Sequence, residues 1–314
     1  MRNKVVTVFG GSGFIGRHVV RKLAGLGATV RVPTRHPERA ISLKPMGGVG
    51  QVVLERWDAT ESEEIARHTV GSTHLVSLVG ILAERRAGDF GRLQGRLPGA
   101  IGAAAAEIGA EGVAHVSAIG ASRESASVYA RTKAEGEEAL RAAFPSAVIL
   151  RPSVVFGPED SFFNRFARMA MLSPALPLIG GGATRFQPVY VGDVADAVVA
   201  VLSDERHTGG TFELGGPKVY TFRELMELML ATLRRRRFLL SVPFGVATAQ
   251  ARLLQLLPDP PLTVDQVQLL QRDNVATAGV PGLAELGIRP TPVEAVIPSY
   301  LSTYALQPRR VHVG

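Results

Sequence analysis

The chain has 314 residues, of which 46% are hydrophobic and 20% charged, so it can bury the core of one large domain or of two small ones. It has no cysteine, which excludes disulfides, thiolate chemistry and cysteine-bound metal centres, and its seven histidines lack the spacing of a zinc motif, so we expect no metal site. The net charge of +7 favours an anionic partner, although a GC-rich genome would produce the same excess of arginine.

No membrane-spanning segment is predicted. No stretch approaches the ~20 consecutive apolar residues of a transmembrane helix. The first residues, MRNKVVTVFGG, lead directly into a predicted strand, which leaves no room for a signal or transit peptide. We therefore expect the chain to lie in the bacterial cytoplasm or on the cytoplasmic face of the membrane.

Strands and helices alternate in the first half of the chain. The apolar run at 5–10 is typical of a strand buried on both faces, and apolar residues at helical spacing follow it. Further strands are predicted at 28–35, 52–58, 73–80, 113–120 and 147–157, and helices at 62–69, at about 90–109 with an interruption at Pro98, and at 129–144. Repeated strand–helix units predict an α/β fold with a doubly wound parallel sheet of the Rossmann type.

The pattern changes after Pro158. We predict a glycine-rich loop at 176–186, a short strand and a helix within 186–202, a helix at 221–233 and a strand at 238–243. We divide the chain into a dinucleotide-binding domain, 1–160, and a smaller mixed C-terminal domain, 161–314. About 186–215 is expected to pack back on the first domain.

A glycine motif, GGSGFIG at 10–16, lies between the first strand and the first helix. Glycines let the backbone approach a pyrophosphate, and the start of the helix attracts its negative charge. A plain tight turn fits this strand–helix context less well. The cofactor-binding residues predicted here are Gly10, Ser12, Gly13, Phe14, Ile15 and Gly16.

The end of the second strand indicates which dinucleotide binds. An NAD site usually has a carboxylate there for the ribose hydroxyls, whereas this chain has Thr34 and Arg35, with Arg39 close behind. A guanidinium suits a 2′-phosphate, so we predict NADP(H); a solvated surface arginine is the alternative. Asp58, after the third strand, either accepts a hydrogen bond from the adenine amino group or caps the next turn.

Tyr129 and Lys133 in YARTK are four residues apart and share one helix face. In reductases the ammonium group lowers the tyrosine pKa and holds the nicotinamide ribose. We therefore assign both residues to the cofactor site and count them as catalytic candidates, vestigial if the chain performs no turnover. The alternative is a surface pair on an amphipathic helix.

Several motifs together carry a resemblance. GGSGFIG, YARTK and LRPSVVFGPE resemble the short-chain dehydrogenase/reductase superfamily in its extended or atypical branch. Longer segments in the second half resemble the nucleotide-binding accessory subunit of respiratory complex I in its alphaproteobacterial form. These segments are SFFNRFARMAMLSPALPLIGGGATRFQPVYVGDVADAV, LGGPKVYTFRELM and LLPDPPLTVDQVQLLQRDNV. The motifs of the first half are shared by very many enzymes, whereas the segments of the second half are far more specific to this subunit.

The resemblance implies an NADP(H)-binding accessory subunit without turnover of its own. Such a subunit holds a structural nucleotide and assembles with other complex I subunits on the cytoplasmic face of the bacterial inner membrane. We expect no nucleic-acid partner. The cofactor site also includes residues in or at the ends of predicted strands, namely Leu78, Val79, Gly80, Ser117 and Pro152.

One catalytic feature of the superfamily is missing. Reactive relatives carry a hydroxyl one or two positions beyond the residue that matches Ser117, where it polarises the substrate carbonyl. This chain has Ala118 and Ile119 there, and the serines at 122, 125 and 127 belong to a predicted loop from which one would have to swing in. Losing such a donor costs ~10²–10³ in rate, so the motif favours a cofactor clamp over a catalyst.

The sequence motifs leave two other functions open. The first is an NADP-dependent reductase, or a sugar-nucleotide epimerase or dehydratase, which the Tyr129–Lys133 pair supports. The second is a redox-sensing regulator that binds a dinucleotide and a partner protein.

A basic cluster, Arg234, Arg235, Arg236 and Arg237, precedes a leucine-rich segment at 244–257. Each arginine near an anionic leaflet contributes about 1 kcal/mol. The segment is predicted to be a helix that is too short and polar to span a bilayer, but is suited to lie on a membrane or a partner. The alternative is a core helix preceded by a solvated arginine turn.

Overall fold

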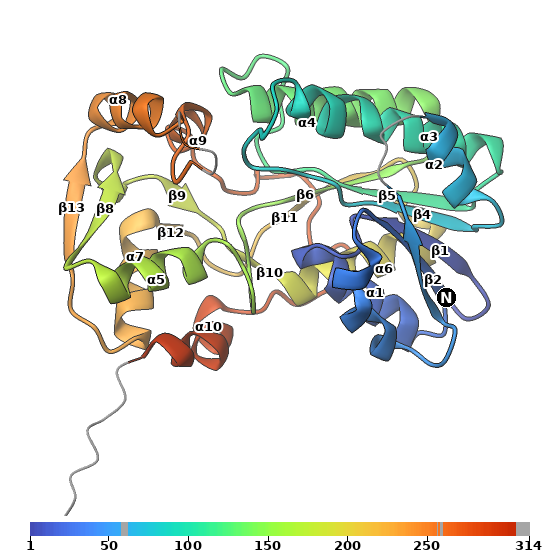
Figure 1. Ribbon diagram of the computed structural model, residues 1–314, viewed down its shortest axis with the longest axis horizontal. Helices are drawn as coiled ribbons and strands as arrows, with labels where there is room; N and C mark the ends of the chain where they lie inside the picture. The colour runs from blue at the N-terminus through green and yellow to red at the C-terminus, as the bar shows by residue number, and fades with distance from the viewer. Residues whose placement is uncertain (58–61, 256, 258–259, 306–314) are drawn as a thin grey trace, which may run out of the picture.

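A computed structural model describes residues 1–57, 62–255, 257 and 260–305. The chain forms two lobes that lie side by side, one built around a large sheet and the other around smaller sheets and helices (Figure 1). No helix in these residues has the length and apolar character needed to cross a membrane.

The large sheet confirms the predicted parallel Rossmann arrangement. Its seven strands lie in the order β11-β6-β5-β4-β1-β2-β3, and every pairing is parallel. The order reverses between β4 and β1, and ligands of doubly wound sheets bind beyond the carboxyl ends of the strands at such a point. The strands are β1 (Val5–Phe9), β2 (Thr29–Thr34), β3 (Val52–Arg56), β4 (His74–Ser77), β5 (Gly112–Val116), β6 (Val148–Pro152) and β11 (Thr211–Leu214).

Helices cover both faces of this sheet (Figure 1). α1 (Phe14–Gly25) and α6 (Val191–Ser203) pack together on one face, and α2 (Ser62–Thr69), α3 (Leu97–Glu107) and α4 (Val128–Ala143) cover the other. Alternate strand residues supply the two cores, since Val8 belongs to the first face and Phe9 to the second. Both faces are therefore apolar, as a doubly wound sheet requires.

Pro98 marks a helix start. α3 begins one residue before it, and a π-helical turn, Gly91–Arg96, precedes α3. A proline is tolerated in the first turn of an α-helix. The predicted helix at 90–109 is thus two differently wound helical segments.

The second lobe is organised around an aromatic core. α5 (Phe163–Leu172), α7 (Phe222–Thr232) and α10 (Val293–Leu301) contribute buried side chains to this cluster. Three two-stranded sheets accompany them, formed by β7 (Val155–Phe156) with β10 (Val189–Tyr190), β9 (Arg185–Phe186) with β12 (Tyr220–Thr221), and β8 (Ala175–Ile179) with β13 (Phe238–Val242). α8 (Phe244–Leu254) and α9 (Val264–Leu269) follow β13.

The loop predicted at 176–186 is partly wrong, because β8 occupies its first residues. Leu176 and Leu178 are fully buried, so the alternation of a strand is present despite Pro177 between them. The proline and the glycines that follow obscure this alternation in the sequence. The leucine-rich helix is also shorter than predicted, since α8 ends at Leu254.

Later segments of the chain return to the first lobe. Between 186 and 215, α6 packs on α1 and β11 pairs with β6. Nearer the end, Asp193 of α6 accepts hydrogen bonds from the amide (2.7 Å) and hydroxyl (2.8 Å) of Thr291. Ser153 donates its hydroxyl to Asn274 Oδ1 at 2.7 Å. These contacts join the two lobes at several points along the sequence.

Candidate functional site

The glycine loop after β1 lies against the end of β4. Gly10 has a φ of +85°, and a Cβ there would lie 3.0 Å from the carbonyl carbon of Leu78 and 3.1 Å from the amide of Val79. A Cβ on Gly16 would lie 2.2 Å from the carbonyl oxygen of Gly10. The close approach of these backbones therefore requires glycine at both positions.

The N-terminus of α1 is uncapped and carries the positive end of the helix dipole. Its N-cap, Gly13, offers no side-chain acceptor, and the first turn contains no acidic residue. The amides of Phe14, Ile15 and Gly16 belong to the first turn, where no carbonyl of the helix can accept from them. These amides and the helix dipole together suit a phosphate group.

The end of β2 provides the positive charge predicted beside the glycine loop. Ser12 and Thr34 share a hydrogen bond of 3.2 Å between their hydroxyls, which ties the loop to this strand. Arg35 follows and is exposed, and it has no ion-pair partner among the residues that the structure describes. Arg39 is also exposed, and Asp58 lies outside the described residues.

Sequence reasoning missed Arg56 as part of this charged end. Arg56 ends β3 and is paired in register with Thr34, so it lies beside the end of β2. Its side chain is exposed, and the carboxylate of Glu38 is 3.9 Å away. Only the pairing of β2 with β3 brings Arg56 to this position. In the sequence, a lone arginine at the end of a strand does not indicate that it belongs to a binding site.

Lys133 lies at the junction of three elements. Its side chain is buried, and Nζ donates a hydrogen bond of 3.2 Å to the carbonyl of Val116 at the end of β5. A Cβ on Gly80, beyond β4, would lie 3.3 Å from the same Nζ. Burial lowers the pKa of Lys133 to about 8, while Glu137 acts in the opposite direction. The ammonium form therefore still predominates at pH 7.

Tyr129 lies one turn before Lys133 at the start of α4, and its ring meets the ring of Phe90 edge-on at 6.0 Å. Burial, and then the charge of Asp265, raise the pKa of Tyr129 to about 12. The phenol can therefore donate a proton in a hydrogen bond, but its phenolate is strongly disfavoured. A reductase that uses a tyrosine as acid and base needs the opposite shift.

Beyond β5 the structure offers no hydroxyl at the two positions that reactive relatives use. Ala118 and Ile119 occupy them, and the Ile119 amide donates to the carbonyl of Pro152 at 3.0 Å. The Ser117 hydroxyl is buried and has no hydrogen-bond partner among the described residues, so it is free to accept or donate.

The three serines that were candidates to replace the missing hydroxyl take part in local turns. Ser122 Oγ accepts from the amide of Glu124, and Ser125 Oγ accepts from the amide of Ser127. Ser127 Oγ caps α4 and donates to Asp265 at 2.8 Å. A hydroxyl engaged in this way would have to break its bonds before it could serve a substrate.

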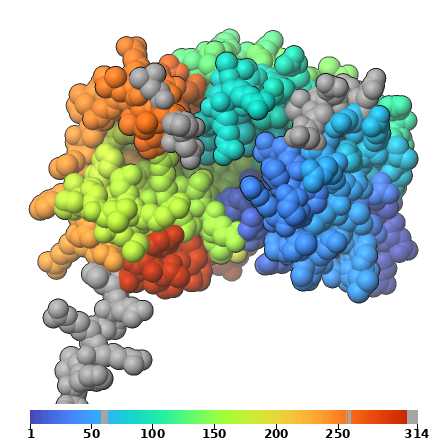
Figure 2. Space-filling model, viewed as in Figure 1, coloured from blue at the N-terminus to red at the C-terminus, as the bar shows by residue number. Residues whose placement is uncertain are grey.

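The predicted cofactor residues that the structure describes thus lie at the carboxyl ends of β1, β2, β4, β5 and β6 or, for Tyr129 and Lys133, on α4 beside them. The glycine loop touches Leu78 and Val79, Gly80 adjoins Lys133, and Pro152 adjoins the residues after β5. Figure 2 shows the surface hollowed where the two lobes meet, between the blue, teal and yellow-green segments. Within the described ranges, no group of three or more metal-ligating side chains is present.

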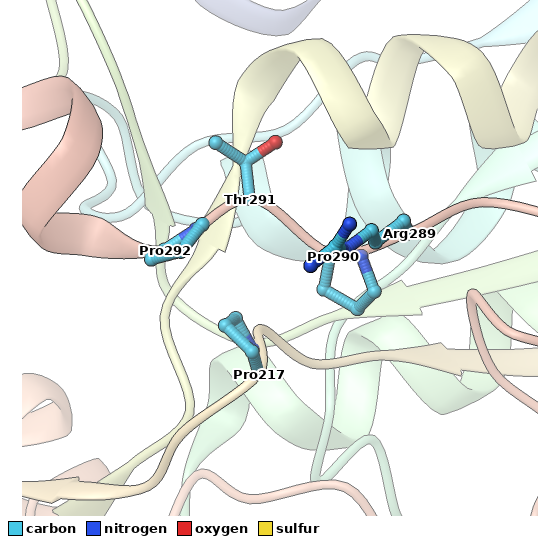
Figure 3. A pocket seen from close by; sticks show the side chains of 5 residues that line it. All are labelled: Pro217, Arg289, Pro290, Thr291 and Pro292. Atoms are coloured by element: carbon cyan, nitrogen blue, oxygen red, sulfur yellow. The ribbon is translucent and has the colours of Figure 1, made fainter.

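A separate surface hollow of about 460 Å³ lies near the start of α6 (Figure 3). It is lined by Pro217, Arg289, Pro290, Thr291 and Pro292. None of the predicted cofactor residues borders this hollow, and Thr291 is already bonded to Asp193. It is therefore distinct from the candidate nucleotide site.

The arginine cluster divides into two pairs. Arg235 donates to the carbonyl of Tyr304 at 3.2 Å and Arg237 to that of Ala170 at 2.7 Å, so both are partly buried structural residues. Arg234 and Arg236 are exposed. The strand that follows, β13, is an exposed apolar edge, because Phe238 is 74% exposed and Leu240 56%.

Known proteins resemble this chain in sequence and in fold. A family model described as the RmlD substrate binding domain matches residues 120–251. Subunit 9 of the mitochondrial NADH dehydrogenase [ubiquinone] 1 alpha subcomplex from Mus musculus is 37% identical, over 92% of this chain and 78% of that protein. The corresponding subunit from Arabidopsis thaliana is 36% identical, over 96% and 78%. A ceramide reductase from Caulobacter vibrioides is 31% identical, over 79% and 76%.

Solved structures with the same fold are more distant in sequence. MoeE5 in complex with UDP-glucose and NAD superposes with a TM-score of 0.72 at 18% identity, over 95% of this chain and 97% of that one. UDP-glucose 4-epimerase from Thermotoga maritima gives a TM-score of 0.71 at 17% identity, over 96% and 98%. These two likenesses show the shared fold of both lobes.

Proposed function

Because this chain belongs to the short-chain dehydrogenase/reductase family that includes subunit 9 of the mitochondrial NADH dehydrogenase alpha subcomplex, we propose that it is an NADP(H)-binding accessory subunit of a bacterial respiratory complex I. The observation that carries the proposal is 36–37% identity to such subunits over more than nine tenths of the chain. In this proposal the nucleotide is structural and the subunit performs no turnover.

The choice of NADP(H) is supported by the charge at the end of β2. A 2′-phosphate would meet Arg35 and Arg56, and the residues at the end of β2, Thr34 and Arg35, include no carboxylate that could bind a free ribose 2′-hydroxyl. The uncapped start of α1 would take the pyrophosphate, and Tyr129 and Lys133 would hold the nicotinamide ribose. Arg35 is available for this role because it has no ion pair to give up within the described residues.

The lack of turnover is supported at two points. Ala118 and Ile119 leave the substrate carbonyl without the donor that reactive relatives place there, which costs ~10²–10³ in rate. The raised pKa of Tyr129 opposes its use as a base. Lys133 keeps its charge and its place near Gly80, which the binding of a ribose needs.

A reductase is the second candidate function. The observation that favours it is 31% identity to a ceramide reductase over 79% of this chain, together with the retained Tyr129–Lys133 pair. Steady oxidation of NADPH by the isolated protein with a ceramide or another carbonyl-bearing compound, abolished in Tyr129→Phe, would establish this function. The likeness to UDP-glucose 4-epimerase concerns the fold alone.

The proposed subunit would lie on the cytoplasmic face of the inner membrane, in contact with other complex I subunits. The exposed pair Arg234 and Arg236 and the apolar outer positions of β13, Phe238 and Leu240, would face the membrane-proximal part of the complex. Arginine beside an apolar surface suits an anionic leaflet or the subunit surface next to it.

The test is isolation of the native protein from membranes under mild detergent. Co-migration with NADH:ubiquinone oxidoreductase activity, and release of NADP(H) on denaturation identified by mass spectrometry, are the expected results. A soluble homodimer that carries no nucleotide and consumes NADPH with a carbonyl substrate would replace this function with the reductase.

A further inference from the structure

Asp265 of α9 caps the helix that carries Tyr129 and Lys133. Its carboxylate accepts hydrogen bonds from the Ser127 hydroxyl at 2.8 Å, the Val128 amide at 2.7 Å and, more weakly, the Tyr129 amide at 3.4 Å. These donors belong to the N-cap and first turn of α4, more than 130 residues earlier in the sequence. A carboxylate at this end of a helix is favoured by the helix dipole as well as by the hydrogen bonds.

The same short helix also contacts the other wall of the nucleotide site. Gln266 donates its side-chain amide to the carbonyl of Leu82 at 3.3 Å, and Leu82 lies two residues beyond Gly80, which adjoins Lys133. Thr263 and Gln266 form a capping box that fixes the start of α9. α9 therefore joins the segment after β4 to the start of α4.

α9 is itself anchored in the second lobe by a small core of its own. Val267 packs in a cluster with Ala247 and Ala251 of α8 and with Ile179 at the end of β8. A displacement of α9 would therefore be transmitted to α8 and to the β8–β13 sheet. This core connects the nucleotide site with the exposed edge formed by β13.

We propose that Asp265 is a positioning residue for the nucleotide site, which fixes the first turn of α4 and thereby couples nucleotide occupancy to the α8–α9 unit. The coupling rests on the nucleotide binding proposed above. α4 is one continuous helix, so a carboxylate that holds its first turn also sets the position of Tyr129 and, one turn later, of Lys133. Both side chains then meet the ribose without a further ordering cost.

The coupling between Asp265 and the nucleotide acts in both directions, so it can be tested in the wild-type chain without a mutation. If Asp265 strengthens nucleotide binding by a given factor, the bound nucleotide must strengthen the Asp265 contacts by the same factor. NADPH should therefore slow hydrogen exchange in 263–270 and at the amides of Val128 and Tyr129. An α9 that only fills space would show no such response to a ligand bound on the other lobe.

The experiment combines exchange mass spectrometry with NADPH titration of the full chain. Asp265→Ala should weaken NADPH binding about tenfold, which corresponds to about 1.4 kcal/mol. It should also abolish the slowing of exchange in α9. Asp265→Asn, which keeps an acceptor oxygen and loses the charge, should recover part of both effects. Thr221→Ala removes a comparable cap from α7, away from the site, and should leave NADPH affinity unchanged.

The outcomes separate the coupling from the function on which it rests. If the wild-type chain binds NADPH and Asp265→Ala binds it equally well, or if NADPH leaves exchange in α9 of the wild type unchanged, the coupling is overturned and the proposed function stands. If the wild-type chain binds neither NADPH nor NADH, the proposed function fails and the coupling fails with it. The wild-type exchange measurement decides the matter even if Asp265→Ala does not fold.

Discussion

Reversing the charge of Arg35 tests the nucleotide preference at its source. Arg35 is exposed and has no ion-pair partner in the described part of the chain, so a 2′-phosphate would not have to displace a carboxylate. Arg35→Asp removes a charged partner and adds repulsion, while Arg56 at the end of β3 remains. We expect NADPH binding to weaken by roughly 2–4 kcal/mol. That loss is about 30- to 700-fold in Kd.

NADH lacks the 2′-phosphate, so its affinity should change little or improve, because an aspartate can accept from the ribose 2′-hydroxyl. Isothermal titration calorimetry of the wild type and the variant with both nucleotides measures this difference. Arg272→Asp, an exposed arginine in the second lobe, makes the same change in net charge and serves as the matched control. Equal affinity of the wild type for NADPH and NADH, or equal losses in the two variants, would refute the reasoning.

Further outcomes are expected from four other changes. Tyr129→Phe should leave complex assembly and activity nearly unchanged, whereas Lys133→Ala should weaken NADPH binding by about 1.5–3 kcal/mol because a charged hydrogen bond is lost; a binding titration together with activity of the purified complex checks both. Arg234→Glu with Arg236→Glu should reduce binding to anionic vesicles, at about 1 kcal/mol per arginine, without changing the melting temperature, and unchanged sedimentation with vesicles would count against membrane contact. Burial lowers the pKa of His115 to about 3 from 6.5, so the folded state binds fewer protons below pH 6.5 and stability should fall as the pH drops from about 6.5 toward 3. The contribution is ~1.4 kcal/mol per pH unit, and denaturant melts of His115→Asn should show a shallower acid slope than the wild type.

The parts of the fold that sequence predicts are those in which local pattern and tertiary position agree. The run at 5–10 and the glycines after it predict both the strand and the close backbone approach at Gly10, because a buried strand requires apolar residues and the close approach requires glycine. The sequence does not predict β8, because Pro177 interrupts its alternation and β13, the strand that pairs with it in the described part of the chain, begins at Phe238. The pairing of distant segments decides such a strand, and no local window contains that information.

The candidate site shows the same division. Gly10, Gly16, Tyr129 and Lys133 belong to motifs whose spacing carries their geometry, and the structure brings them to the same edge of the sheet. Asp265 could not be found in this way, since it reaches α4 from a separate element across more than 130 residues. The division of the chain at residue 160 and the binding roles of the site residues stay predictions.

The order in which the chain is synthesised bears on how the first lobe can form. β11 is the edge strand next to β6, and it is made only when residues 211–214 have left the ribosome. Until then the edge of β6 is unpaired, and until α6 has emerged the sheet face that it covers is exposed. Both features promote aggregation of nascent chains. The contacts of Ser153 with Asn274 and of Asp193 with Thr291 close later still. The N-terminal lobe is therefore completed by the last third of the chain, and its sheet edge is open to association with other chains until that part has emerged.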